Sequence, residues 1–251
     1  KIIRGIDMYP KTNMETAGCL RSFDGVHLGH QKLIKILKDE SENRGLSSLV
    51  FTFYPHPLKI IAPQSEPPMI TSLDQRADLI AQYGIDYFLV ANFDQEFAKI
   101  SAEDFIINLL YKKLNAKTVV IGFNNTFGYK GLGTPKMLKE FGDKLGFKVV
   151  IVEPVTKNGI VVSSTEIRKT LLEGKITLAN ELLGRHFFLE GKVVRGDGRG
   201  KKLGFPTANL EVSPDIVIPN NGVYAVKVTY DGKAYAGALN IGTKPTFAGK
   251  I

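Results

Sequence analysis

The sequence predicts an α/β fold, in which a Rossmann-like parallel sheet with helices on both faces is followed by a small antiparallel β-barrel. Three observations carry this prediction. Short apolar strands alternate with helical patterns through the first 152 residues, a rhythm typical of parallel sheets. Near residue 183 the rhythm changes to short alternating strands separated by glycines. The length of 251 residues suits two modest domains, which we place at 1–182 and 183–251.

The individual elements are placed by apolar periodicity and by capping residues. Strands are expected at 17–20, 46–53, 85–90, 117–121 and 147–152 in the first domain, and at 187–194, 222–230 and 233–241 in the second. Helices are expected at 31–44, 71–83, 101–114, 134–145, 163–174 and 177–183. Residues 1–16 are expected to form an irregular or edge segment, and the proline-rich segment 58–70 a loop. Thr71 and Asp74 resemble a capping box, and Asp231-Gly232 predicts a hairpin turn.

Composition restricts the class of protein. No apolar run approaches the roughly 20 residues of a membrane helix, and no secretory signal is visible. Cys19 is the only cysteine, so no intrachain disulfide is expected, and a cytoplasmic location without membrane contact is the simplest setting. The net charge of +8 comes from scattered Lys and Arg, which suits a polyanionic small molecule and predicts no nucleic-acid partner. A monomer or weak oligomer is expected.

The turn at 22–30 contains two of the four histidines, His27 and His30, with Gly29 between them. Backbone N–H groups at a helix N-terminus favour anions, and two imidazoles add donors that can carry positive charge. This combination favours the phosphates of a nucleotide. A metal pair or two incidental loop histidines are the alternatives. Zinc is disfavoured because Asp24 is the nearest carboxylate and no third ligand cluster is evident.

A second helix start has similar chemistry, because Arg168 follows one turn after three hydroxyl side chains, Ser163, Ser164 and Thr165. A plain N-cap is the alternative. Ligands of parallel sheets bind beyond the carboxyl ends of the strands, so four turns are expected to converge on one site. These turns are 22–30, 54–57, 122–130 and 159–168. Two phosphate-binding helix starts at one site predict nucleotidyl transfer, which depends on positioning and charge stabilisation.

The segment Phe23-Asp24-Gly25-Val26-His27-Leu28-Gly29-His30 resembles the His-x-Gly-His signature of the nucleotidylyltransferase superfamily. Ser163-Ser164-Thr165 with Arg168 is similar to its second signature. The Phe-Asp-Gly-Val-His form, with Thr52-Phe53-Tyr54-Pro55-His56-Pro57 after it, resembles the bacterial bifunctional riboflavin kinase/FAD synthetase family. The chain departs from the pattern of this family at three positions: Arg21, where a glycine is usual, Asn124, where an aspartate is usual, and Tyr54, where an acidic residue is usual. Arg21 would either crowd the backbone near the ATP or add a phosphate contact, and the other two departures remove negative charge.

This resemblance implies that His27, His30 and Arg168 are catalytic, the histidines stabilising the ATP phosphates while the FMN phosphate attacks the α-phosphorus. It implies ATP or phosphate binding by Phe23, Asp24, Gly25, Gly29, Ser163, Ser164 and Thr165. It implies contacts to FMN or the nucleotide by Gly122, Phe123 and Asn124, and His56, which stands between two prolines, is expected to contact the nucleotide. A loop-stiffening role is the alternative for His56. Structural roles are expected for His186, Cys19, Phe51 and Phe53.

The second domain contains a run of spaced glycines that ends in Gly204-Phe205-Pro206-Thr207-Ala208-Asn209. Such glycines let the backbone approach a ligand closely, although tight barrel turns explain any single one. Thr207 and Asn209 offer oxygens suited to Mg²⁺. The run resembles the riboflavin kinase signature, and Asn240–Phe247 is similar to that family. The resemblance implies ATP or flavin binding by Gly196, Gly200, Lys202, Gly204, Pro206, Thr207 and Asn209, with Thr207 and Asn209 at the metal.

The function expected from both signatures is FAD biosynthesis. The barrel phosphorylates riboflavin with Mg²⁺–ATP, and the α/β domain adenylylates FMN to FAD with release of pyrophosphate. One alternative is a nucleotidylyltransferase for another phosphorylated acceptor, with the barrel as a ligand-binding module. Another is a barrel that binds RNA or DNA, which predicts clustered basic residues where only Lys201-Lys202 occur. The first residue is not Met and the family's kinase general base is expected beyond Ile251, so we expect a fragment with an incomplete kinase domain.

Overall fold

The computed structural model describes residues 1–10, 14–195, 204 and 207–242. The chain divides into two compact units, Lys1–Ser164 and Thr165–Ile251. Each unit is described by itself.

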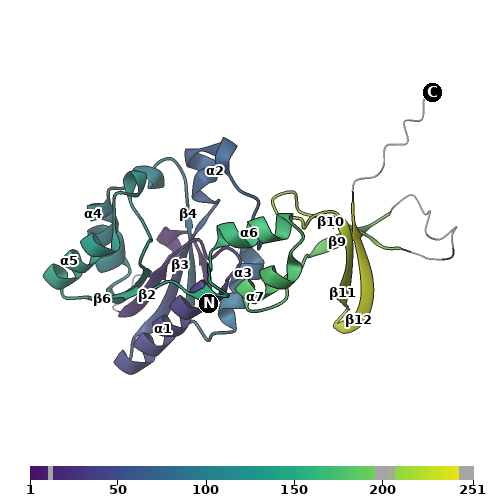
Figure 1. Cartoon of the computed structure of the whole chain (residues 1–251). Helices are drawn as coiled ribbons and strands as arrows, with labels where there is room; N and C mark the ends of the chain where they lie inside the picture. The colour runs from purple at the N-terminus through teal and green to yellow at the C-terminus, as the bar shows by residue number, and fades with distance from the viewer. Residues whose placement is uncertain (11–13, 196–203, 205–206, 243–251) are drawn as a thin grey trace. The chain divides into compact units, whose positions relative to one another are not determined.

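Six parallel strands form the sheet of the first unit (Figure 1). Their bounds are β1 Ile2–Arg4, β2 Thr16–Leu20, β3 Ser47–Tyr54, β4 Tyr87–Asn92, β5 Ala116–Gly122 and β6 Lys148–Val152. The strand order is β1-β4-β3-β2-β5-β6, and every neighbouring pair is parallel. The chain therefore moves from β2 first to one side and then to the other. The order reverses between β2 and β5, which is where open α/β sheets bind ligands.

The helical segments of this unit start at side-chain caps in several cases. They are η1 Ile6–Met8, α1 Leu28–Arg44, α2 Pro57–Ile61, η2 Pro63–Ser65, α3 Leu73–Ala81, η3 Phe97–Lys99, α4 Ala102–Asp104, the π-helix η4 Phe105–Lys113, η5 Tyr129–Gly131 and α5 Pro135–Leu145. The bounds of α5 are as predicted, because the Thr134 hydroxyl accepts the N–H of Met137 at 3.2 Å and Pro135 occupies the first helical position. A left-handed Gly45 ends α1, also as predicted.

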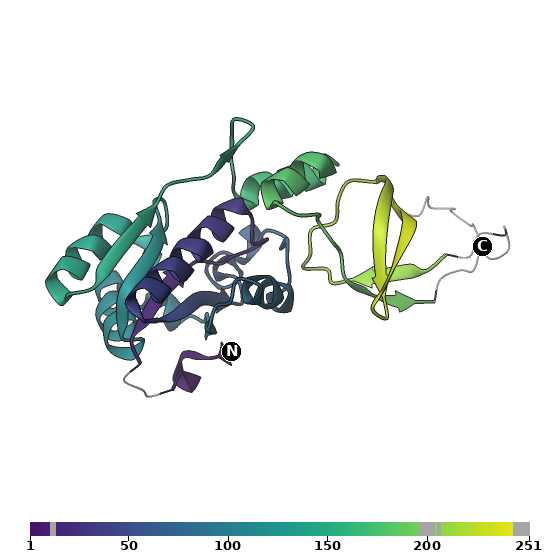
Figure 2. The same cartoon turned by 90° about the horizontal axis from the view of Figure 1, so that it is seen from below.

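Alternate side chains of the central strands pack on opposite faces of the sheet. In β3, Leu49 and Phe51 belong to one buried cluster and Val50 to the other. The first cluster is completed by residues of η4 such as Ile106, and the second by residues of α1 such as Ile34. Figure 2 shows α1 lying along the sheet. Helices therefore cover both faces, which confirms the α/β prediction for this unit.

The capping box of α3 was predicted one residue too early. The Ser72 hydroxyl accepts the N–H of Gln75 at 3.1 Å, and the Gln75 carboxamide oxygen accepts the N–H of Ser72 at 2.9 Å. Ser72 and Gln75 thus form the box, not Thr71 and Asp74. Thr71 instead accepts the N–H of Gly25 at 2.9 Å, so tertiary structure rather than helix capping engages its hydroxyl.

The segment 58–70 was expected to be a loop, but the structure places α2 and η2 there. Pro57 suits the first helical position, since its fixed φ fits a helix and its missing N–H has no intrahelical partner to lose. The His56 Nδ1 atom accepts the N–H of Leu58 at 3.3 Å and caps the helix. The prolines therefore start short helical turns here rather than excluding them.

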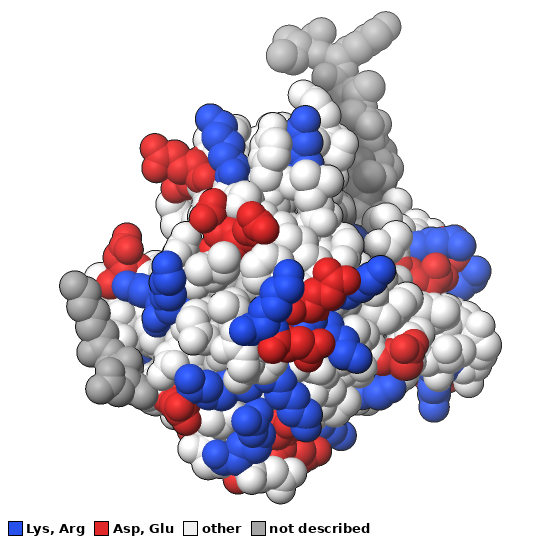
Figure 3. Space-filling view, turned by 90° about the vertical axis from the view of Figure 1, so that its left-hand side faces the viewer, with Lys and Arg blue, Asp and Glu red and all other residues white. Residues whose placement is uncertain are grey.

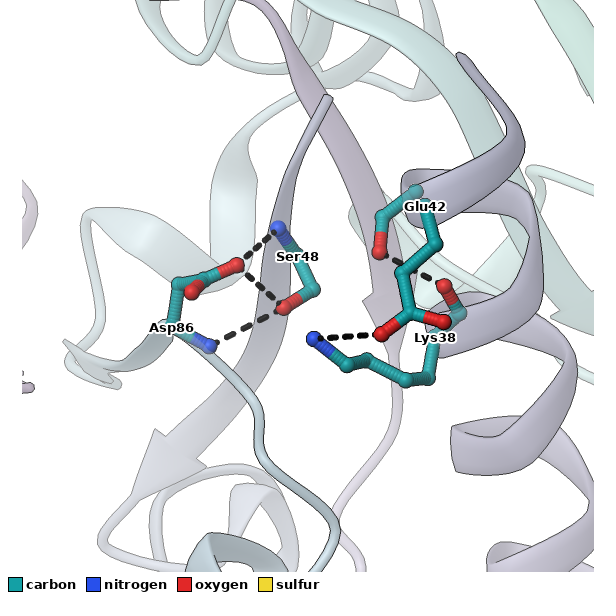
Figure 4. A network of polar contacts seen from close by, with 5 residues as sticks. Lys38, Glu42, Ser48 and Asp86 are labelled. Atoms are coloured by element: carbon teal, nitrogen blue, oxygen red, sulfur yellow. Dashed lines mark hydrogen bonds and ion pairs between the residues drawn. The ribbon is translucent and has the colours of Figure 1, made fainter. Parts of the chain in front are cut away.

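Ser48 and Asp86 connect β3 to the chain before β4, at the end of the sheet where these strands begin (Figure 4). The Asp86 carboxylate accepts the N–H of Ser48 at 2.8 Å and its hydroxyl at 2.6 Å. Burial raises the pKa of the Asp86 carboxyl, but the bonds from Ser48, together with the charges of Lys38 and the N-terminus, outweigh it, so the pKa lies below its ordinary value. Beside them, Lys38 and Glu42 of α1 form an ion pair at 3.2 Å.

A short hairpin of β7, Thr156–Lys157, and β8, Ile160–Val161, follows the sheet and was not predicted. The remaining elements are α6 Ser164–Leu172, α7 Ile176–Leu183, β9 Gly191–Val194, β10 Asn209–Val212, β11 Gly222–Tyr230 and β12 Lys233–Ile241. The bounds of β11 and β12 are as predicted. Asp231 and Gly232 join them with φ values of 48° and 70°, as a type I′ turn requires.

The strands of the second unit pair as two separate antiparallel sheets, β9 with β10 and β11 with β12. Within the described residues these sheets do not close, so the barrel is not confirmed. The strand expected at 187–194 starts only at Gly191, and β10 was not predicted. A Cβ atom at Gly191 would lie 2.4 Å from the carbonyl oxygen of Glu211, so the approach of β9 to β10 needs glycine there.

In the described part of the chain, no helix combines the length and the apolarity that crossing a bilayer requires. Figure 3 shows the face that lies on the left in Figure 1, where acidic and basic side chains are interspersed. The described residues also form ion pairs such as Lys148–Glu40, at 2.7 Å.

Candidate active site

The turn between β2 and α1 places both predicted histidines at the start of α1. Three of its residues have positive φ: Phe23 at 52°, Gly25 at 80° and Val26 at 38°. Glycine adopts such values readily, whereas for Phe and Val they are strained. The side chains of Phe23 and Val26 are buried in the cluster that includes residues of α1, so core packing holds the strained turn in place.

The carboxylate of Asp24 fixes the turn to the segment before α3. It is fully buried and accepts the N–H of Ile70 at 3.0 Å, the N–H of Thr71 at 3.1 Å and the Thr71 hydroxyl at 3.3 Å. These bonds give Asp24 a positioning role in the turn. Its predicted contact with phosphate stays a prediction.

Arg76 of α3 is a second support of this turn, and the sequence analysis missed it. Its guanidinium is buried and donates to the carbonyl oxygen of Ser22 at 2.8 Å and to that of Ser72 at 3.3 Å. Burial lowers the pKa of the Arg76 guanidinium, while the charges of Asp24 and Tyr54 act in the opposite direction. An arginine on the core-facing side of a helix was the sequence signal that could have found it.

His27 caps α1 with its own ring. The Nδ1 atom accepts the N–H of Gly29 at 3.1 Å and that of His30 at 3.3 Å. The rings of His27 and His30 stack with centroids 3.6 Å apart, and Phe23 packs against His30 at 5.2 Å. Because Nδ1 accepts, the proton of a neutral His27 lies on Nε2. Two backbone groups that were expected to bind an anion are thus engaged by His27, and Nε2–H is the donor that this ring offers instead.

A cavity of about 60 Å³ lies beside the two histidines, at the carboxyl ends of β2, β5 and β6. This is the point where the strand order reverses. Of the predicted site residues, it is lined by His27, Gly29, His30, Gly122, Phe123, Asn124 and Ser163. The other residues that line the cavity were not predicted as site residues; they are Arg21, Leu33, Val152, Glu153, Pro154, Val155, Val161 and Val162.

Three of the four turns expected to converge therefore do so. The turn at 54–57 contributes none of the described residues that line this cavity, and its His56 caps α2. The Ser164 hydroxyl donates to the carbonyl oxygen of Asp24 at 2.9 Å, which ties the start of α6 to the histidine turn. Thr165 and Arg168 follow in the second unit, and their phosphate contacts stay predictions.

Arg21, a departure from the family pattern for which crowding of the backbone or a phosphate contact was expected, lines this cavity. Its Nη1 atom donates to the Asn124 carboxamide oxygen at 3.3 Å. A Cβ atom at Gly122 would lie 3.0 Å from the same nitrogen, so the guanidinium lies against bare backbone. Burial lowers the pKa of the Arg21 guanidinium, as expected for a cation withdrawn from water.

The riboflavin kinase signature of the second domain lies only partly within the described residues. Thr207 and Asn209 are exposed, and Asn209 is the first residue of β10. Their hydroxyl and carboxamide oxygens are ligands of the kind that Mg²⁺ takes. Gly204 has a φ of 80°, which glycine adopts readily. The predicted residues Gly196, Gly200, Lys202 and Pro206 lie outside the described residues, as does most of the segment 240–247.

Comparison with known proteins agrees with both signatures. The family model of FAD synthetase matches residues 10–166, and that of riboflavin kinase matches residues 183–251. The bifunctional riboflavin kinase/FMN adenylyltransferase of Buchnera aphidicola subsp. Schizaphis graminum is 42% identical over 249 residues, which cover 98% of this chain and 80% of that protein. The protein of the same description from Bacillus subtilis is 42% identical over 227 residues, 90% of this chain and 71% of that protein.

A solved structure is similar over the same length. A crystal structure described as a macrolide-efflux protein from Streptococcus pneumoniae has a TM-score of 0.87 at 31% identity, covering 98% of this chain and 80% of that one. The Escherichia coli K12 bifunctional riboflavin kinase/FMN adenylyltransferase is 38% identical over 99% of this chain and 80% of its own length. The chain therefore belongs to the family of bifunctional riboflavin kinase/FMN adenylyltransferases.

Proposed function

We propose that this chain makes FAD from riboflavin in two ATP-dependent steps. Riboflavin kinase activity converts riboflavin to FMN, and FMN adenylyltransferase activity converts FMN to FAD. The observation that carries the proposal is the stacked pair His27 and His30 at a cavity where the strand order reverses, within the segment that matches FAD synthetase. Nucleotidyl transfer needs positioned donors rather than a nucleophilic side chain, and this pair supplies them.

In the adenylyl transfer, a phosphate oxygen of FMN attacks the α-phosphorus of ATP. A bond from that oxygen to phosphorus forms, the bond to the bridging oxygen of the β-phosphate breaks, and pyrophosphate leaves. Negative charge shifts to the phosphoryl oxygens and to the leaving group. His27 is held by its Nδ1 contacts so that Nε2–H is its donor to such an oxygen, and His30 is held against it by ring stacking. Fixed donors of this kind need no reorganisation during the reaction.

Glycines make room for this arrangement. A Cβ atom at Gly29 would lie 3.1 Å from Cε1 of His27, so glycine there lets the ring lie over the helix start. Gly25 has a φ of 80° and adjoins Ile70. We assign phosphate contacts to Gly29 and Ser163 at the cavity, and to Ser164, Thr165 and Arg168 in the next helix start. In this proposal, FMN or the nucleotide is contacted by Gly122, Phe123 and Asn124.

The second domain, which we place at 183–251, carries the kinase step in this proposal, as a β-barrel that includes β9 to β12. The ribityl hydroxyl attacks the γ-phosphorus of ATP: the new oxygen–phosphorus bond forms, the bond to the oxygen that bridges the β- and γ-phosphates breaks, ADP leaves, and the hydroxyl proton is released. Thr207 and Asn209 would hold Mg²⁺, which neutralises charge on the ATP phosphates. The glycine run would let the backbone approach the nucleotide. The proposal also includes a cytoplasmic monomer or weak oligomer with flavins and ATP, and no nucleic acid, as its partners.

Two incubations test the proposed function, each followed by chromatography of the flavins. In the first, the protein receives FMN, ATP and Mg²⁺, and we expect FAD together with an equal amount of pyrophosphate. In the second, it receives riboflavin, ATP and Mg²⁺, and we expect FMN followed by FAD. Absence of FAD from FMN would overturn the adenylyltransferase assignment. FAD from FMN without any product from riboflavin would overturn the kinase assignment for this chain.

A further inference from the structure

A half-buried cation, Arg21, lines the cavity beside the histidines. Among the described residues, none of the ion pairs within 4.0 Å involves Arg21. Its side-chain partner is the carboxamide of Asn124, which is neutral. Glu153 also lines the cavity, yet it forms no ion pair with Arg21 at that distance. A cation that is partly withdrawn from water is stabilised by an opposite charge beside it, so this position favours an anionic ligand.

The surroundings of Arg21 also suit an anionic ligand. Gly122 has no side chain to displace the guanidinium, whose Nη1 would lie 3.0 Å from a Cβ atom there. Arg21 follows the end of β2, His27 and His30 lie at the start of α1, and Ser163 lies in the loop before α6, and all four line one cavity. A guanidinium offers a planar fork of donors that matches two oxygens of a phosphate group.

We propose that Arg21 binds a phosphate oxyanion of the substrates in this cavity, next to the histidine pair. Because Asn124 is neutral, it leaves the positive charge of Arg21 available to that oxyanion. The inference rests on the proposed function, because that function brings phosphates to this site. The shared chemistry is a phosphate group, which belongs either to the pyrophosphate part of ATP or to FMN. Arg21 acts as a binding residue that holds the reacting group, in addition to the donors of the two histidines.

The test compares wild type with Arg21→Gln, Arg21→Lys and Asn124→Asp. Arg4→Gln is the matched control, because it removes the same charge from an exposed residue of β1 that pairs with Asp74 outside the cavity. Pyrophosphate is titrated by calorimetry to report the ATP side, since the kinase step releases no pyrophosphate. The KM for FMN in FAD formation at saturating ATP reports the flavin side. Circular dichroism and the thermal midpoint verify that each variant is folded.

We expect Arg21→Gln to weaken one of these two affinities about tenfold, which is the effect of one lost charge-assisted hydrogen bond. Arg21→Lys should recover part of the lost affinity, because lysine keeps the positive charge but lacks the planar pair of donors of the guanidinium. Asn124→Asp should produce a similar loss with Arg21 still present, because the new carboxylate neutralises the guanidinium. Loss confined to pyrophosphate assigns the ATP side, and loss confined to FMN assigns the flavin side.

The inference is overturned if folded Arg21→Gln and Asn124→Asp both bind pyrophosphate and FMN as wild type does. It is also overturned if Arg4→Gln causes the same loss, because the effect would then be one of net charge. The outcome is separable from that of the proposed function. If wild type forms no FAD, the proposed function fails, and the pyrophosphate titration still decides whether Arg21 holds a phosphate.

Discussion

Arg21 and Asn124, which are 103 residues apart in the chain, are joined by a hydrogen bond of 3.3 Å between Nη1 and the carboxamide oxygen. Both positions were expected to depart from the family pattern, and both residues line one cavity. An aspartate at position 124 would form an ion pair with the guanidinium, whereas the amide leaves its charge in place. The third departure, Tyr54, is half-exposed and does not line this cavity.

We assign two roles to His27, a helix cap and a donor to phosphate, and different substitutions separate them. His27→Ala removes the N-cap of α1 and the Nε2 donor, so we expect a loss of stability of about 1–2 kcal/mol and a loss of FAD formation. His27→Asn restores a side chain that caps helices well but has no donor in the same place, so stability should recover more than activity. Urea unfolding and the rate of FAD formation check this. Parallel recovery of both quantities would contradict the assigned donor role.

His30→Ala should slow FAD formation about 10²–10³-fold, the usual effect of losing one positioned donor at a phosphoryl or acyl transfer site. Phosphorylation of riboflavin should keep its wild-type rate, because the kinase step is assigned to the second domain. Both rates are measured by chromatography of the flavins in the same preparation. His186→Ala, at the exposed Asn180 contact, is the control and should change neither rate. Equal losses of the two activities in His30→Ala would contradict separate sites.

Cys19 should be inert in the folded protein. It is fully buried in β2, and burial raises the pKa of its thiol to about 12, so the reactive thiolate is nearly absent at pH 8. We expect a thiol reagent to label the native protein only as fast as the protein unfolds. Labelling along a urea gradient should follow the unfolding transition measured by circular dichroism. Rapid stoichiometric labelling in the absence of urea would contradict the buried position.

The contact between Asp86 and Ser48 predicts a pH dependence of stability. The pKa of the Asp86 carboxyl is lowered below its ordinary value of 3.8 in the folded protein, because the bonds from Ser48 and the charges of Lys38 and the N-terminus together outweigh the raising effect of burial. A lowered pKa contributes stability that is present above the unfolded pKa and is lost as the pH falls through the folded pKa. Asp86→Asn should therefore be less stable than wild type at pH 7, and the difference should shrink below about pH 4.

Urea unfolding of both proteins between pH 3 and pH 7 measures this difference. Ser48→Ala is the companion variant, because it removes the hydroxyl donor and keeps the carboxylate. Like Asp86→Asn, Ser48→Ala should lower the free energy of unfolding at pH 7, and its difference from wild type should also shrink as the pH falls. A difference between wild type and Asp86→Asn that stays constant over the whole range would contradict the lowered pKa.

Much of the fold was readable from the sequence because the signals that carry it are local. The Thr134-Pro135 start of α5, the left-handed Gly45 after α1 and the Asp231-Gly232 turn each depend on a few neighbouring residues. The alternation of strands and helices also predicted the parallel sheet, since apolar periodicity follows from burial. The signature around His27 predicted the kind of site for the same reason, because its residues are contiguous.

The remaining features depended on strand order, which apolar periodicity does not encode. Only the reversal between β2 and β5 brings Gly122 and Asn124 next to Arg21. Only the tertiary structure pairs Asp24 with the backbone of Ile70, and the same packing made Thr71 a partner of the turn rather than a helix cap. The sequence by itself determined which chemical groups stand at the site. The tertiary structure decided which of them meet, because hydrogen bonds between distant segments form only after the sheet has fixed where each strand ends.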